Sequence, residues 1–527
     1  MKLRILSATL CLLAMTLPVR GQEAAVCCDF CFATGINPHL SLSNPSAISA
    51  FGGHISMAEL DFRKDNGALI SLTESPDSYK AGAATESYFK VSDKITFHGR
   101  LSWSYISGRQ MGAQVLMDPD FNPVNFLESD EATVGVKNRE DYSMLGAMSY
   151  KLGDKWALGC EADYSAADQT KVKDPRFSNV WMDLALKSGF SFTPADDKLL
   201  GAYLFYRSTM EQVRGGIYGT TDKQYFVMAD KGGFFGTVAG LSGDIDYVPM
   251  TEYRPMKNDF FGLSLQALTG AWSNELEVSY RMGYYGKQAS GSATYFEFSG
   301  LRAGYDGGFL ARSGSNIHKA TLSLDYELLG NDENVFKFVT PSGQETRVEY
   351  SGKNHIFDRH MASAAISYVW HKGADGYLPE FSIGANVSGR GRVQTTVLYP
   401  FYRNTDCFTI DAEAFADRNI RKGASVFSFG GKLAFRSGWG TPKDDGTYAT
   451  TTSSNLKSFD NYLFRQFEFD TAPAAGAGLS FAYTRIISDK VAPYVKLSDS
   501  FLMLLAEPQY LGGRIRNVAL IAIGCNF

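Results

Sequence analysis

The residues of this chain whose types and spacing could do chemistry are few. Its seven histidines are scattered, at positions 39, 54, 98, 318, 355, 360 and 371. Only His355, Asp358 and His360 form a short cluster, and this spacing could supply metal ligands or an acid–base pair for hydrolysis. The chain contains no Gly-x-Ser-x-Gly element, which would position a nucleophilic serine. Because a single short cluster in a polar loop is more often a solvated surface, we predict no catalytic residue and no metal site.

Cysteines are the second chemically competent group. The seven are Cys11, Cys27, Cys28, Cys31, Cys160, Cys407 and Cys525. The cluster of Cys27, Cys28 and Cys31 could form a local disulfide in an exported protein, or contribute thiolates to a metal. No histidine or fourth cysteine stands beside it, so a local disulfide or free thiols is the better hypothesis. The isolated Cys160 and Cys525 fall on apolar faces, and we interpret them as packing residues.

A third group consists of charged side chains that alternate with apolar ones along the chain. Those that we predict to share one wet or ion-paired interior are Glu161, Asp163, Glu275, Glu277, Arg281, Asp325, Glu327, Asp411, Glu413, Lys432 and Arg436. Their mixed signs argue against strong selection for one sign of ion. Pairing across strands that stiffens a wall explains these charges at least as well as a role in transport.

The elements that must position these charges are β-strands with two unlike faces. Trp156, Leu158 and Tyr164 lie on one face of such a strand, and Glu161 and Asp163 lie on the other. Period two predicts strands, because the apolar residues of a helix would recur at three or four. Many runs reach ~10 residues, as a tilted span through hydrocarbon requires, whereas soluble strands average ~5–6. The same alternation recurs at 275–284, 320–328, 408–414 and 427–436, and in the last fourteen residues, 514–527.

Turn lengths provide an independent test of this interpretation. Tight hairpins are predicted at 92–94, 153–155, 196–198 and 488–490, and long polar segments near 108–140, 213–256, 286–315, 340–357 and 438–470. Short turns at one rim and long loops at the other predict an all-β fold, a transmembrane antiparallel β-barrel with short periplasmic turns and long extracellular loops. Counting alternating runs gives roughly 16–18 strands, with 14 as the alternative, because strands in the stretch 286–357 are hard to place.

The N-terminal part of the chain divides into two further segments. A charged start, an apolar run and a small-residue exit predict a signal peptide over 1–21. Residues 22–53, punctuated by Asn-Pro pairs, are predicted to form a periplasmic or lumen-plugging segment, and 54–527 the barrel. After residue 22 no apolar run reaches 18 residues, which excludes a helical membrane protein. The net charge of -5 gives no reason to expect nucleic acid as a partner.

Two short motifs resemble known families. Asn44-Pro45-Ser46-Ala47 is similar to the Asn-Pro-Ala turn near the start of fatty-acid-transporter-like outer-membrane barrels, which implies an N-terminal segment folded into the pore. The stretch Asp174-Pro175-Arg176-Phe177-Ser178-Asn179 resembles the Asp-Pro-Arg-x-x-Asn loop of uncharacterised outer-membrane β-barrel proteins of Bacteroidetes, often encoded beside TonB-dependent receptors. Phe177 stands where that family has a second proline. The resemblance implies a barrel over most of the mature chain and no established activity.

These observations predict a non-enzymatic integral β-barrel of the cell outer membrane, with membrane lipid as one partner and no cofactor. By family analogy alone, accessory service to a surface uptake system ranks first, with a TonB-dependent receptor or surface lipoprotein as partner. A passive or gated diffusion channel for small polar or amphipathic solutes is the alternative, and an outer-membrane hydrolase is the second alternative. The candidate ligand or partner contacts are Asp174, Arg176 and Asn179, for which a structural role in the loop is the favoured interpretation.

Overall fold

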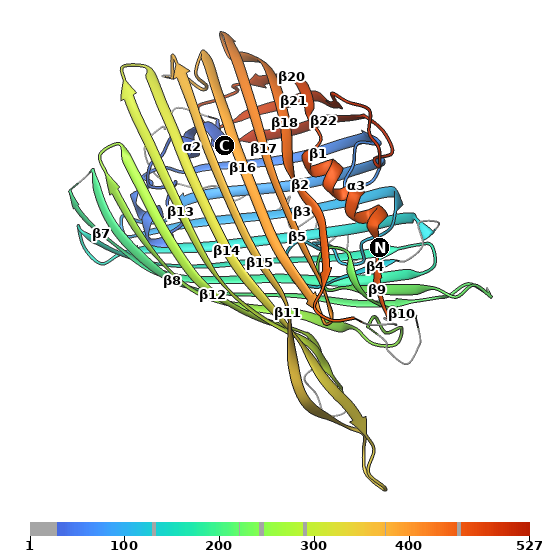
Figure 1. The fold of residues 1–527 in the computed structure, drawn as a ribbon. Coiled ribbons are helices and arrows are strands. Elements are labelled where there is room, and N and C mark those ends of the chain that lie inside the picture. The colour runs from blue at the N-terminus through green and yellow to red at the C-terminus, as the bar shows by residue number, and fades with distance from the viewer. Residues whose placement is uncertain are drawn as a thin grey trace.

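The computed structural model describes residues 29–128, 133–195, 197–220, 222–241, 247–287, 292–374, 376–450 and 455–527. Within these residues eighteen antiparallel strands form one closed sheet, in which each wall strand pairs with the next and β22 pairs back with β1 (Figure 1). The predicted all-β barrel is confirmed, and the strand count is 18 and not 14. The signal peptide predicted over 1–21, Cys27, Cys28 and Asp196 of one predicted turn lie outside the described residues.

The wall strands differ in length, and several extend beyond the span of a membrane. They are β1 (Ile55–Gly67), β2 (Asp77–Lys90), β3 (Ile95–Met111), β5 (Gly135–Lys151), β6 (Trp156–Lys171), β7 (Arg176–Ala195), β8 (Lys198–Gly216), β11 (Arg254–Thr269), β12 (Trp272–Gly286), β13 (Thr294–Ser313), β14 (Asn316–Val339), β15 (Arg347–Lys372), β16 (Phe381–Leu398), β17 (Phe401–Lys422), β18 (Ser425–Thr447), β20 (Ala474–Arg485), β21 (Ala492–Leu504) and β22 (Ile515–Asn526). None of the described helices is long and apolar enough to cross a membrane.

The connections are short at one end of the barrel and long at the other, as predicted. β5 and β6, for example, are joined through residues 152–155, whereas β8 and β11 are separated by residues 217–253. The long loop predicted at 286–315 is wrong, because most of that stretch is strand β13. Its glycines interrupt the apolar face and weaken the sequence signal. Most of the segment 340–357 is likewise the start of β15.

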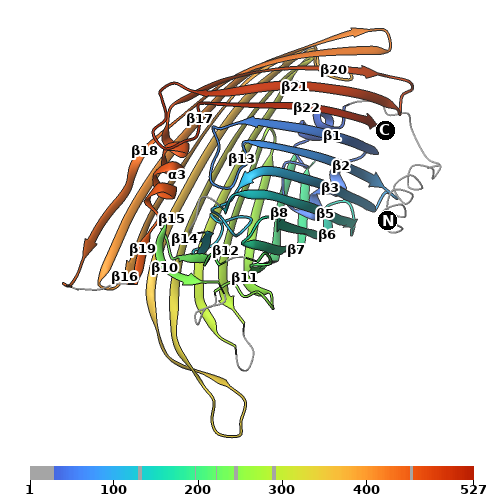
Figure 2. The same cartoon turned by 90° about the vertical axis from the view of Figure 1, so that its right-hand side faces the viewer.

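β14 and β15 continue past the rim as a projecting hairpin. Pairing of β13 with β14 ends at Glu333, and pairing of β15 with β16 ends at Phe357. Residues 334–356 therefore project from the loop end of the barrel, and among the described residues the hairpin's own two strands are the ones paired in its backbone ladder (Figure 2). Within the described part of the chain, neither outer edge of this hairpin has a ladder partner, and strand edges of this kind can pair with another strand.

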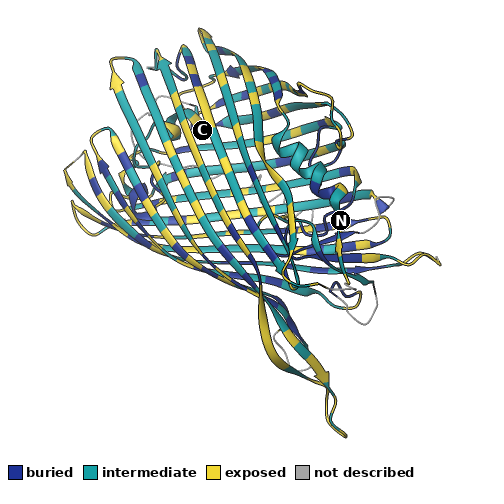
Figure 3. Cartoon of the chain, in the orientation of Figure 1, coloured by how far each residue is buried: buried dark blue, intermediate teal, exposed yellow. Residues whose placement is uncertain are grey.

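The outer face of the barrel is apolar and is bordered by aromatic rings. Exposed and less exposed residues alternate along the wall strands (Figure 3). In β6, Trp156 and Tyr164 are 49% and 39% exposed, and exposed Leu158 lies between them. Trp272 and Tyr280 repeat this arrangement in β12. Eight residues span ~26 Å along a strand, or about 20 Å in height after a tilt of about 40°, which is comparable to the ~25 Å apolar band of outer-membrane barrels.

Long loops fold back inside the barrel and form a second, four-stranded sheet. Its members are β4 (Asn125–Glu128), β9 (Phe226–Asp230), β10 (Phe235–Gly240) and β19 (Leu456–Ser458). Phe126 and Ala229 of this inner sheet are fully buried in a cluster with wall residues such as Met256 and Phe296. The helix α3 (Asp460–Thr471) follows β19 and packs against the inner wall, where Phe469 covers the guanidinium of Arg436 at 5.2 Å.

The N-terminal segment occupies the lumen near the short turns. It contains α2 (Phe30–Gly35) and the 3-10 helix η1 (Pro45–Ala50). Asn44, at the start of η1, donates its Nδ2 to the carbonyls of Phe190 and Ala202 at 3.0 and 3.3 Å. Glycines on three neighbouring strands make room for this turn, because a Cβ at Gly159 would collide with the backbone of Ser46. The other two are Gly189 and Gly201, where a Cβ would meet the side chain of Asn44.

Candidate functional site

The loop between β3 and β4, residues 112–124, enters the lumen and is held there by arginines of the wall. We call this segment the inner loop. Arg281 of β12 donates Nη2 to the carbonyl of Phe121 at 2.8 Å and to Oδ1 of Asn122 at 3.2 Å. Its guanidinium also lies 4.5 Å from the centre of the Phe121 ring. Arg281 is 1% exposed and pairs with Glu327 at 2.9 Å, so its charge is compensated inside the barrel.

Three further arginines hold the tip of the inner loop at Asp120. Arg359 of β15 donates Nη1 to the Asp120 carbonyl at 2.7 Å. Arg392 of β16 donates Nη1 to the carboxylate at 3.0 Å, and Arg390, two residues earlier on the same face, lies 3.6 Å from it. Loss of hydration inside the barrel opposes ionisation of Asp120, but the charges of Arg392, Arg390 and Arg359 outweigh it and lower the pKa of the carboxyl. The tip is therefore an anionic group inserted into a row of cations.

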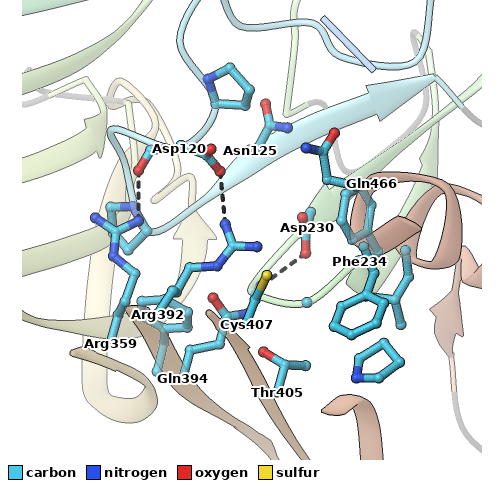
Figure 4. A pocket seen from close by; sticks show the side chains of 18 of the residues that line it. Asp120, Asn125, Asp230, Phe234, Arg359, Arg392, Gln394, Thr405, Cys407 and Gln466 are labelled. Carbon is cyan, nitrogen blue, oxygen red and sulfur yellow. Dashed lines mark hydrogen bonds and ion pairs between the residues drawn. The ribbon is translucent and has the colours of Figure 1, made fainter. Parts of the chain in front are cut away.

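A polar cavity lies beside this ion cluster. Its volume is about 550 Å³, and it is lined by residues of the inner loop, of α3 and of strands β14 to β18. A smaller pocket of about 70 Å³ continues from it, with Asp120 between Arg359 and Arg392, and with Phe234 and Gln466 across the space (Figure 4). At the short-turn end, a further cavity of about 720 Å³ lies between α2 and residues such as Gly270 and Leu310. Hollow space thus exists at both ends of the lumen.

The structure places the predicted interior charges on the inner wall, where each has a partner. Arg281 and Glu327 belong to the cluster around the inner loop. Asp411 and Arg436 pair at 3.0 Å beside the cavity. The remaining predicted charges bind Arg100, Lys187, Arg302 or Tyr203, or pair with each other: Glu161–Lys187, Asp163–Arg100, Asp325–Arg302, Glu413–Lys432, and Glu275 and Glu277 with the Tyr203 hydroxyl. Glu275 also accepts from the Ser43 backbone at 2.9 Å, which anchors the N-terminal segment.

The three candidate contact residues of the Asp-Pro-Arg stretch do not form one site. Asp174 accepts from Arg176 Nε at 2.9 Å and from the Gly219 backbone at 2.7 Å, and the Arg176 guanidinium covers Tyr218 at 5.3 Å. These contacts join two neighbouring loops at the rim. Asn179 lies 1% exposed within the wall, where its Nδ2 donates to the carbonyl of Val115 and to Glu211. It therefore belongs to the base of the inner loop.

The histidine cluster lies on the outside of β15. His355 contacts Asp332 and Asp358 at 2.8 and 2.9 Å, whereas the ring of His360 is bonded to the Tyr326 hydroxyl at 2.8 Å. In the described part of the chain, no group of three His, Cys, Asp or Glu side chains could hold a metal ion. Nor is there a disulfide among the described cysteines, which include Cys31.

Asp120, Arg359, Arg390 and Arg392 are not among the residues predicted from the sequence. A signal for the last two was present, since Ser388, Arg390, Arg392 and Gln394 alternate with apolar or glycine positions in β16. No comparable signal marks Asp120, because its position depends on partners more than 200 residues away in the chain.

The fold and the site together define a large closed β-barrel whose lumen is partly filled by its own loops. Residues 45–527 match the family described as "Family of unknown function (DUF6850)", and the chain belongs to that family. No curated protein matches the chain.

Among solved structures, several outer-membrane transporters are similar to the chain. The transporter YddB from Escherichia coli matches at 8% identity and a TM-score of 0.39, over 89% of this chain and 80% of that chain. The ferric citrate transporter FecA matches at 8% identity and 0.37, over 90% and 78%. The CymD monoaromatic hydrocarbon channel matches at 9% identity and 0.28, over 96% and 94%.

Proposed function

We propose that this protein is a non-enzymatic barrel of the outer membrane that passes small polar solutes through a gated lumen. The observation that carries the proposal is how the inner loop is attached. Its carbonyls at Val115, Asp120 and Phe121 accept hydrogen bonds from wall side chains, namely Asn179, Arg359 and Arg281. A segment bound to the wall by side chains can detach without breaking the barrel's ladder, and a polar cavity lies directly behind it.

The membrane location is supported by the outer face. A band of exposed leucine, isoleucine and valine between two levels of tryptophan and tyrosine fits hydrocarbon bounded by two interfaces. The interior charges predicted from the sequence are, by contrast, each paired or hydrogen-bonded on the inner wall, which suits a polar lumen. The short turns then face the periplasm, and the long loops with the inner sheet face the outside.

Planar-bilayer conductance of the purified mature protein tests the channel. The variant Arg281→Met removes one anchor of the inner loop and leaves Glu327 paired with Arg359 at 3.1 Å, so no buried charge loses its only partner. We expect a small conductance for the wild type and a severalfold larger one for this variant. The control, Arg302→Met with Asp325→Leu, removes a wall pair of 2.6 Å that does not touch the loop, and it should leave conductance unchanged. If neither the wild type nor the loop variant conducts, the channel function is ruled out.

Accessory service to a surface uptake system is the second candidate function, and the projecting hairpin favours it. Val335, Phe338 and Tyr350 are 43%, 54% and 51% exposed on this hairpin, and both its edges can accept another strand. The resemblance to Bacteroidetes barrels encoded beside TonB-dependent receptors points to such a receptor, or a surface lipoprotein, as the partner.

Affinity isolation from native outer membranes in mild detergent tests this second function. A stoichiometric receptor or lipoprotein should accompany the wild type and be lost when residues 336–353 are replaced by a short turn. Recovery of the wild-type barrel alone, or of the same partner with both proteins, would contradict a role of the hairpin in recruitment.

A further inference from the structure

The carboxylate of Asp120, on the inner loop, occupies a position that would also suit the carboxylate or phosphate group of a solute. Three arginines and three aspartates line the cavity of about 550 Å³ beside the inner loop. Asp411 pairs with Arg436, and Asp470 accepts from the Gln466 amide at 3.3 Å. Asp120 is therefore the carboxylate that Arg390 and Arg392 hold, and no other described carboxylate makes an ion pair with either of them.

The geometry of β16 makes these two arginines a binding pair. Residues two apart on a strand project to the same face, ~7 Å apart, so the two long side chains can converge on one anion. Guanidinium groups bind carboxylate and phosphate through charge-assisted hydrogen bonds. Arg390 is 43% exposed and Asp120 is 53% exposed, so both face the cavity and not a packed core.

The neighbouring surfaces leave room for the rest of a solute. Ser363, Ala364 and Gly389 form a floor of small residues, and Phe234 and Phe469 form apolar walls. On this basis, and resting on the proposed channel function, we propose that a small organic anion binds Arg390 and Arg392 by displacing Asp120. The loop tip then loses its ion pairs, so binding of the anion and release of the inner loop are coupled.

Linkage predicts how strong this competition is. Asp120 is tethered, so it competes as an intramolecular ligand at an effective concentration on the order of millimolar. A solute anion should displace Asp120 at concentrations in the same range. Removing the Asp120 charge removes the competitor, so the anion should then bind Arg390 and Arg392 more tightly.

Calorimetric titration of the purified full barrel in detergent tests the proposal, with succinate and inorganic phosphate as probes and glucose as the neutral control. Asp120→Asn should bind the anions about tenfold more tightly than the wild type. Arg390→Gln with Arg392→Gln should lose binding, and Arg302→Gln, which removes an arginine of the wall outside the cavity, should bind as the wild type does. Preference for succinate over phosphate, or the reverse, identifies which anion the site takes.

Several results would overturn this inference without touching the channel itself. If neither anion binds, or if Asp120→Asn binds no more tightly, Asp120 is not an internal substitute for a ligand. If the double arginine variant still binds, the site lies elsewhere. Conductance measured on the same preparations distinguishes failure of this proposal from failure of the channel, because a conducting protein that binds no anion contradicts only the former.

Discussion

Two adjacent residues of β14 have opposite surroundings. Leu324 is 41% exposed on the outer apolar face, whereas Ser323 lines the inner cavity. An arginine at a lipid-facing position near the bilayer midplane costs ~2–4 kcal/mol, and one in a wet lumen costs little. We therefore expect Leu324→Arg to reduce the amount of folded, heat-modifiable barrel in the outer membrane, and Ser323→Arg to leave it near normal. Equal damage from both substitutions would show that the register of the strand is wrong.

The stability of the inner sheet depends on pH through the carboxyl group of Asp230. Burial raises the pKa of Asp230 to about 6, although the backbone N–H groups of Gly232 and Phe235 bind its carboxylate. A raised folded-state pKa means that the sheet is stabilised by the protonated acid, and that this stabilisation is lost as the pH rises through about 6. The loss is at most about 3 kcal/mol.

Hydrogen exchange of amides 226–240, corrected for intrinsic rates, measures this effect. Protection in the wild type should fall as the pH rises from about 4 to about 6.5, because over that interval the carboxyl of Asp230 is protonated in the folded sheet but ionised in the opened state. Asp230→Asn does not titrate, so its protection should be flat across the same range. A parallel fall in both proteins would assign the pH dependence to another group.

At the scale of elements, the fit of η1 into the wall depends on glycine. Gly159→Val would place a side chain against Pro45 and Ser46, so the turn must leave its groove and Asn44 must lose its contacts with β7 and β8. We expect cleavage of residues 29–53 by added protease to become severalfold faster while the barrel itself stays folded. Gly146→Val on β5 is the control, since a Cβ there meets nothing within 4 Å. Unchanged cleavage of the Gly159 variant would show that the groove does not hold the segment.

The sequence predicts regular elements well and tertiary insertions poorly. Period-two alternation arises where one face of a strand contacts lipid and the other contacts a polar lumen. From this pattern we could assign the wall strands and the charged residues that face inward, such as Arg281 and Glu327. Strand β13 was not predicted, because a glycine does not indicate which face of a strand is apolar. The strands of the inner sheet are only 3 to 6 residues long, which is too short for an alternating pattern to be recognised. Helix α3 and the position of Asp120 depend on contacts between distant segments, which local patterns do not encode.

The barrel is closed by the pairing of its first strand, β1, with its last strand, β22. Without this pairing, both strands would expose a long unpaired edge. Near the loop end of the pair β1–β22, Arg516 donates to both carboxylate oxygens of Asp65 at 3.0 and 2.7 Å, and to Glu74 at 2.7 Å. Asp65 is only 5% exposed, so removing the arginine would leave this buried carboxylate with Arg63, at 2.9 Å, as its remaining ion-pair partner. The first and last strands are thus joined by side chains as well as by backbone.

Arg516→Ala should therefore weaken closure of the barrel more than loss of an exposed arginine does. Breaking a buried ion pair costs roughly 3–5 kcal/mol, and partial exposure of Arg516 reduces this figure. We expect the temperature at which the folded band converts to the unfolded band in electrophoresis to fall by several degrees. Arg485→Ala, which loses only an exposed hydrogen bond to Ser425, is the control and should convert as the wild type does. If the two variants convert at the same temperature, opening does not begin at this seam, and the rim where β14 and β15 leave the wall becomes the next place to test.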